Sequence, residues 1–184
     1  VGPHSPDRAR PISALAAEVD DRENGFIDQI DTCLIGSCTN SSYEDMSRAA
    51  DVAGQASGKG VGAAVAFMVT PGSEQVRATI ERDGQMEALK KIDGTVLANA
   101  CGPCIGQWKR EKALDGVSNT IVTSYNRNFP RRNDGRSETM NFIASPEIVT
   151  AMAVAGRLSF NPLSDSLTDA AGNQFRFRPC LLYT

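Results

Sequence analysis

The sequence is poor in histidine, in aromatic residues and in long apolar runs. Its 184 residues include one histidine, His4, and 6% aromatic side chains. A histidine near one end belongs to no Cys/His zinc pattern, so this type of zinc site is excluded. No run approaches the ~18 apolar residues of a membrane span, so we expect no membrane partner. The net charge is −3, so a general attraction to nucleic acid is not expected.

Cysteines are few and unevenly spaced. Their number is five, and an odd count without regular spacing is a poor disulfide framework. Free or metal-binding thiols in a reducing compartment fit better. The first residues, Val1-Gly2-Pro3, contain neither a methionine nor an apolar targeting core, and we expect this to be a cut through a longer chain.

Short apolar runs alternate with helical patterns along most of the chain. Strands are predicted at 30–35, 63–69, 95–100 and 119–123, and helices at 42–55, 73–82, 85–91 and 145–156. This alternation predicts an α/β fold, a three-layer α/β/α arrangement with a mostly parallel sheet. We expect an arm or linker at 1–24, the α/β domain at 25–178, with a small hairpin near its end, and an irregular tail at 179–184.

Polar motifs follow three of the predicted strands, at 36–41, 101–104 and 124–132. In sheets of this kind ligands gather beyond the carboxyl ends of the strands. Cys38, Cys101 and Cys104 fall in the first two motifs, and thiolates favour iron–sulfur clusters or zinc. The residues alone leave three interpretations open, which are a cluster with three thiolate ligands, half of a zinc site and a redox dithiol.

The third motif is rich in arginine, with four arginines between 127 and 136. The guanidinium group offers a planar fork for a carboxylate or phosphate. Arg131 and Arg136 are interpreted as solvated. Arg127 directly follows a predicted strand, where the sheet should place its ligand.

Three motifs carry a resemblance to the aconitase family, in its mitochondrial type. They are Gly36-Ser37-Cys38-Thr39-Asn40-Ser41, Ala100-Cys101-Gly102-Pro103-Cys104 and Ser124-Tyr125-Asn126-Arg127-Asn128-Phe129. Members of this family interconvert citrate and isocitrate through cis-aconitate, in the mitochondrial matrix or, alternatively, the cytoplasm. The resemblance implies that the chain is the third of four domains.

The resemblance also implies roles for individual residues. Cys38, Cys101 and Cys104 match the ligands of a [4Fe–4S] cluster whose fourth iron binds the substrate. Arg127 and Arg132 match ligands of a tricarboxylate substrate, and Asn126 matches a residue beside the cluster. The acid and base groups belong to the other domains of the enzyme, so no catalytic residue is expected here and the isolated chain should be inactive.

One departure keeps alternatives open. Mitochondrial members usually have a histidine before the phenylalanine at 142, where this chain has Met140-Asn141-Phe142. A homoaconitase or isopropylmalate dehydratase would share the cluster but act on another substrate. An RNA-binding relative without a cluster is the alternative from another class, with the basic loop 127–136 as its local support. An electron carrier is disfavoured by three cysteines instead of four.

Overall fold

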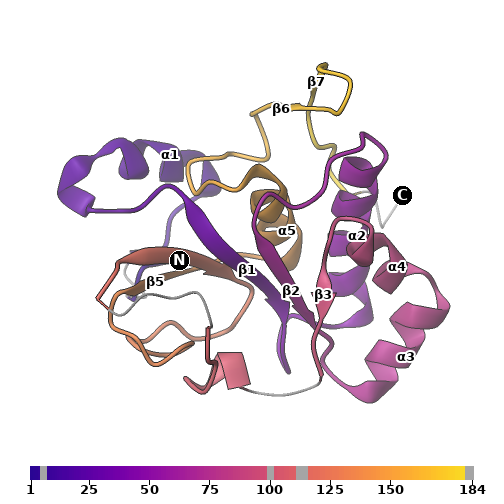
Figure 1. The fold of residues 1–184 in the computed structure, drawn as a ribbon, viewed down its shortest axis with the longest axis horizontal. Helices are drawn as coiled ribbons and strands as arrows, with labels where there is room; N and C mark the ends of the chain where they lie inside the picture. The colour runs from indigo at the N-terminus through magenta and orange to yellow at the C-terminus, as the bar shows by residue number, and fades with distance from the viewer. Residues whose placement is uncertain (5–7, 99–101, 111–115, 181–184) are drawn as a thin grey trace.

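The computed structural model describes residues 1–4, 8–98, 102–110 and 116–180. Its centre is a five-stranded sheet in the order β3-β2-β1-β4-β5, with every neighbouring pair parallel (Figure 1). The strands are β1 (Ile30–Gly36), β2 (Ala66–Thr70), β3 (Thr95–Val96), β4 (Asn119–Thr123) and β5 (Thr139–Ile143). The predicted α/β fold with a mostly parallel sheet is confirmed.

Helices connect the strands and flank the sheet. They are α1 (Ile12–Asp20), α2 (Tyr43–Ser57), α3 (Glu74–Arg82), α4 (Gln85–Lys90) and α5 (Pro146–Ala155), with the short 3-10 helices η2 (Arg22–Asn24) and η3 (Gly102–Cys104). A separate antiparallel pair, β6 (Leu167–Thr168) and β7 (Gln174–Phe175), confirms the predicted hairpin. No helix in the described ranges is long and apolar enough to span a bilayer.

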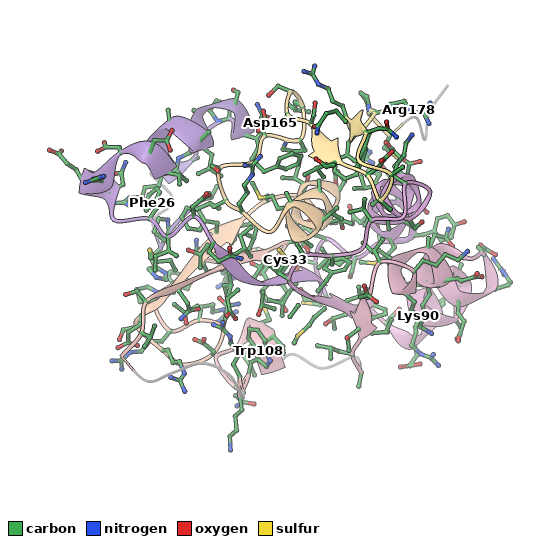
Figure 2. The ribbon with its side chains drawn as sticks, turned by 45° about the horizontal axis from the view of Figure 1, so that its top comes forward. Phe26, Cys33, Lys90, Trp108, Asp165 and Arg178 are labelled. Atoms are coloured by element: carbon green, nitrogen blue, oxygen red, sulfur yellow. The ribbon has the colours of Figure 1, made fainter. Side chains whose placement is uncertain are left out.

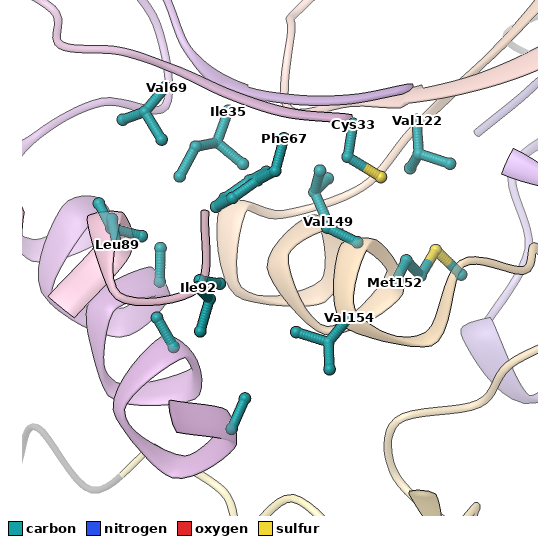
Figure 3. Packing of buried hydrophobic residues seen from close by; sticks show 14 of the residues in the cluster. Cys33, Ile35, Phe67, Val69, Leu89, Ile92, Val122, Val149, Met152 and Val154 are labelled. Carbon is teal, nitrogen blue, oxygen red and sulfur yellow. The ribbon is translucent and has the colours of Figure 1, made fainter. Parts of the chain in front are cut away.

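One face of the sheet carries the main hydrophobic core. Cys33 and Ile35 of β1 project from this face toward α5, together with Phe67 and Val122 from the neighbouring strands (Figure 3). α5 presents Met152 to them, and α2 packs beside α5 with a row of buried alanines. This close-packed layer holds the strands in register and thereby fixes where each strand ends.

The opposite face is covered differently in the described part of the chain. Leu34, Tyr125 and Cys104 form a second buried cluster, against which Trp108 packs. Figure 2 shows Trp108 on the far side of the sheet from α5. The connection from β3 to β4 crosses the sheet in the direction opposite to the β1–β2 connection, so right-handed crossovers place it on the opposite face. η3 and the segment after it therefore cover the face where a second layer of helices was expected.

Local signals set the helix ends that the sequence predicts. Ser42 and Asp45 form a capping box at the start of α2, because each side chain accepts the other residue's backbone N–H. Pro146 occupies the first turn of α5, and Gly156 ends that helix in the left-handed conformation, at φ 74°.

Four elements differ from the sequence-based expectations, among them β2, which was predicted to begin at residue 63 but begins at Ala66. Residues 12–20, expected within an arm or linker, form α1, and the buried side chain of Leu15 packs on the main core of this domain. β5 was not predicted, because Asn141 interrupts the apolar pattern of this strand. The Asn141 side chain is buried and hydrogen-bonded to Thr123 and Asn128. β3 was predicted to run to residue 100 but ends at Val96, and residues 99–100 lie outside the described ranges.

Candidate functional site

The loop after β1 has an unusual backbone. Gly36, Ser37 and Asn40 all have positive φ, at 101°, 86° and 54°. Serine is seldom found there, and such strain persists only when the surroundings enforce it. A Cβ on Gly36 would overlap the carbonyl oxygen of Thr70, so the loop passes very close to the end of β2. The result is that Cys38 stands exposed at the carboxyl edge of the sheet.

Ser124 ties this loop to β4. The Gly36 N–H donates to Ser124 Oγ at 2.9 Å, and Asn40 Nδ2 donates to the Ser124 carbonyl oxygen at 2.7 Å. Connections leave β1 and β4 toward opposite edges of the sheet, so the gap between their carboxyl ends is its topological switch point. The Cys38 loop and the segment after β4 therefore meet where open α/β sheets bind ligands.

The described residues around Cys104, 102–110, are called the cysteine turn, and they lie beside this point. Cys104 is in η3, is 7% exposed, and packs with Leu34 and Tyr125. Burial and the neighbouring Cys104 raise the pKa of Tyr125, so its hydroxyl stays protonated at neutral pH. Cys101, the remaining predicted ligand, lies outside the described residues.

The predicted arginines occupy two different settings. Asn126 and Arg127 are exposed after β4, and both line a hollow of about 320 Å³. Arg132 instead turns toward Cys104, with Nη2 3.9 Å from Cys104 Sγ. Its Nε is buried and has no hydrogen-bond partner among the described residues.

Cys33 does not belong to this arrangement. Its side chain is fully buried in the core on the helical face of the sheet, whereas Cys104 packs on the opposite face. Burial raises the pKa of the Cys33 thiol, which keeps it protonated and unsuited to metal ligation. Cys33 is therefore a core residue and cannot act as a fourth ligand beside Cys104.

The residues that surround Cys38 and Cys104 fit a thiolate-held cofactor. Two thiols reach the same edge of the sheet, and the partly buried guanidinium of Arg132, whose buried Nε is unpaired among the described residues, supplies positive charge beside one of them. Within the described ranges no group of three or more His, Cys, Asp or Glu side chains could hold a metal ion. Cys101 lies outside those ranges, so the three-thiolate centre remains a prediction.

Sequence reasoning missed two residues that build the site. Ser124 was quoted only as part of a motif, yet it joins the Cys38 loop to β4. Asn133, 3% exposed, donates from Nδ2 to the carbonyl oxygen of Pro103 at 3.0 Å. The one signal in the sequence was their position, because both are small polar residues in the segment that follows a predicted strand.

Fold and site together define an α/β domain that presents thiols and arginines at the carboxyl edge of a parallel sheet. The model of the aconitase family (aconitate hydratase) matches residues 3–156, and the chain belongs to this family. It is 58% identical over 178 residues to the probable mitochondrial aconitate hydratase of Dictyostelium discoideum and 57% identical to the mitochondrial aconitate hydratase of Saccharomyces cerevisiae. These matches cover 97% of the chain but 23% of each relative.

A solved structure is also similar in part. The holo-form of aconitase X from Thermococcus kodakaraensis matches 76% of this chain and 29% of its own, at 18% identity and a TM-score of 0.39. The chain thus spans less than a quarter of the length of the curated relatives it matches.

Proposed function

We propose that this chain is the cluster-bearing part of a hydro-lyase that interconverts citrate and isocitrate through cis-aconitate in the mitochondrial matrix. Family membership and the names of the similar relatives, mitochondrial aconitate hydratases, support this proposal. The structural observation that carries it is the approach of Arg132 to Cys104, beside a Cys38 loop fixed by Ser124.

In this proposal Cys38, Cys101 and Cys104 hold a [4Fe–4S] cluster. When bound, the cluster supplies a Lewis-acidic iron without a protein ligand, which makes hydroxide a better leaving group. The strained loop after β1 presents Cys38, and η3 presents Cys104. Asn126 would lie beside the cluster, where its amide could hydrogen-bond to it and adjust its properties.

The arginines supply the charge that a tricarboxylate needs. Arg127 is exposed at the hollow after β4, where its guanidinium can form paired hydrogen bonds to one carboxylate. Arg132 contributes a second guanidinium with an unpaired donor at Nε. The groups that move protons would come from the other domains of the enzyme, so we expect residues 1–184 alone to have no hydratase activity.

Asn141, which stands where mitochondrial members of the family usually have a histidine, does not favour another substrate. Asn141 Oδ1 accepts from Thr123 Oγ1 at 3.1 Å, and its Nδ2 donates to Asn128 Oδ1 at 3.3 Å. Its side chain therefore supports the segment after β4 from inside the sheet. Homocitrate and isopropylmalate turnover are outcomes that an assay of the full-length enzyme would reveal.

The direct experiment is anaerobic reconstitution of the full-length enzyme with iron and sulfide, followed by iron counting and electron paramagnetic resonance. The parent should bind a [4Fe–4S] cluster whose spectrum changes on addition of citrate. Cys38→Ser and Cys101→Ser should fail to hold it, whereas Cys180→Ser, remote in sequence from the three motifs, should resemble the parent. A parent that takes up zinc instead, or whose cluster ignores every tricarboxylate, would refute the proposal.

A further inference from the structure

Two segments that are separate in the sequence, the cysteine turn and residues 131–134, are hydrogen-bonded to each other next to Cys104. Asn133 forms two hydrogen bonds with the cysteine turn. Its side-chain Nδ2 donates to the Pro103 carbonyl oxygen at 3.0 Å, and its backbone carbonyl oxygen accepts from the Trp108 N–H at 3.3 Å. Pro103 and Trp108 flank Cys104 on either side. With 3% of its surface exposed, Asn133 makes these contacts out of reach of water, where a hydrogen bond is strong and specific.

A second tie lies one residue further along. Arg110 Nη1 donates to Asp134 Oδ2 at 3.0 Å, and the two side chains are 4% and 1% exposed. The backbones also approach closely, since a Cβ on Gly106 would come within 3.0 Å of the Arg131 carbonyl oxygen. The cysteine turn and residues 131–134 consequently form one rigid unit on the face of the sheet opposite α5.

Arg132 lies inside this unit. It directly precedes Asn133, its backbone N–H donates to the Phe129 carbonyl at 3.0 Å, and its Nη2 lies 3.9 Å from Cys104 Sγ. A long side chain of this kind loses substantial rotamer freedom when it binds a ligand. A backbone held in place at the next residue means that no backbone freedom is lost in addition, and it fixes the point from which the Arg132 side chain extends toward Cys104.

We propose that Asn133 is a positioning residue that fixes Arg132 relative to Cys104, so that substrate binding depends on the hold of Asn133 on the cysteine turn. The proposal builds on the proposed function and adds a role for a residue that does not touch the substrate. It acts through Arg132, and coupling between the two residues is therefore its specific signature.

The experiment uses the full-length enzyme with its cluster reconstituted, and citrate affinity read from the citrate-dependent change in the cluster's spectrum. Asn133→Ala should retain the iron content of the parent and bind citrate about tenfold more weakly, the scale of one lost hydrogen bond. In an Arg132→Ala background the same substitution should change the affinity less than twofold, because neighbours that act as a unit are not additive.

Thr150→Val is the matched control. Thr150 is also buried and donates to a backbone carbonyl, that of Pro146 at 2.8 Å, but it lies in α5 on the other face of the sheet. Its removal should leave citrate affinity unchanged. If Asn133→Ala does not retain the cluster, Asn133→Ser, which keeps a shorter donor, is measured against the same criteria, and a loss about half as large on a logarithmic scale is expected.

The outcomes separate this inference from the proposed function. A parent enzyme that responds to citrate, with Asn133 variants that bind citrate within twofold of it, would overturn the positioning role alone. An equal loss with and without Arg132 would also overturn it, because Asn133 would then act by another route. A parent without a cluster or without a citrate response would overturn both.

Discussion

Removing the Asp134 carboxylate should destabilise the domain far more than removing a second carboxylate that contacts the same arginine. Arg110 pairs with Asp134, whose side chain is 1% exposed, and with Asp31, whose side chain is 49% exposed. Asp134 also accepts from Thr139 Oγ1 at 2.7 Å and from the Arg136 N–H at 3.1 Å. The perturbation is Asp134→Ala, and Asp31→Ala is its control.

The magnitude follows from burial. Breaking a buried ion pair by removing one partner costs about 3–5 kcal/mol, because the other charge stays buried without compensation. Arg110 keeps Asp31 and the Asn119 side-chain oxygen at 2.6 Å, so we expect the lower end, about 3 kcal/mol. Asp31 is half exposed, and its removal should cost at most about 1 kcal/mol. For a chain of this length, about 3 kcal/mol corresponds to a decrease in Tm of roughly 6–12 °C.

The assay is urea and thermal unfolding followed by circular dichroism on the parent chain and both variants. Asp134→Asn should fall between them, since the amide keeps an acceptor for Thr139 but loses the charge. Equal losses for Asp134→Ala and Asp31→Ala would refute the reasoning, because burial would then not determine what each partner contributes to the free energy of unfolding.

Three further outcomes are expected. Gly36→Ala should prevent folding, because its Cβ would overlap a carbonyl oxygen of β2, whereas Gly54→Ala in the open part of α2 should be neutral or stabilising, as judged by soluble yield and Tm. In the native chain without metal, iodoacetamide should label Cys38 and spare Cys33, which mass spectrometry of peptides would show. The backbone N–H of Asn161 holds the pKa of the Asp165 carboxyl below its ordinary 3.8. The ionised carboxylate therefore stabilises the folded state above that pH, and this stabilisation is lost on acidification. Asp165→Asn should make the decrease in Tm below about pH 4 less steep than in the parent.

Most of the fold could be predicted from the sequence because its signals are local. The capping box at Ser42, the proline at 146 and the glycine at 156 each act within one helical turn, and the structure confirms all three. β5 could not be predicted in this way. Asn141 reads as a break in an apolar strand until its partners Thr123 and Asn128 are known, and those contacts exist only once β4 and β5 have paired.

The same distinction between local signals and contacts of distant segments applies to the residues of the candidate site. The sequence indicated the residues with conspicuous chemistry, Cys38, Cys104 and the arginines, because thiols and guanidinium groups after apolar runs are unusual. It did not indicate Ser124 or Asn133, whose side chains bind backbone atoms of distant segments. Such contacts span 88 residues in one case and 30 in the other, and no local pattern encodes them.

The parallel topology explains why the chain can maintain a strained loop at its site. Ser37 and Asn40 adopt positive φ, which costs of order 1–3 kcal/mol for each residue. The compensating contacts come from β2, through the Thr70 carbonyl, and from β4, through Ser124. Only a strand flanked on both sides by parallel neighbours has two strand ends beside its own carboxyl end, and β1 occupies that central position. The placement of Cys38 is therefore a consequence of strand order, which is why the loop sequence alone cannot specify it.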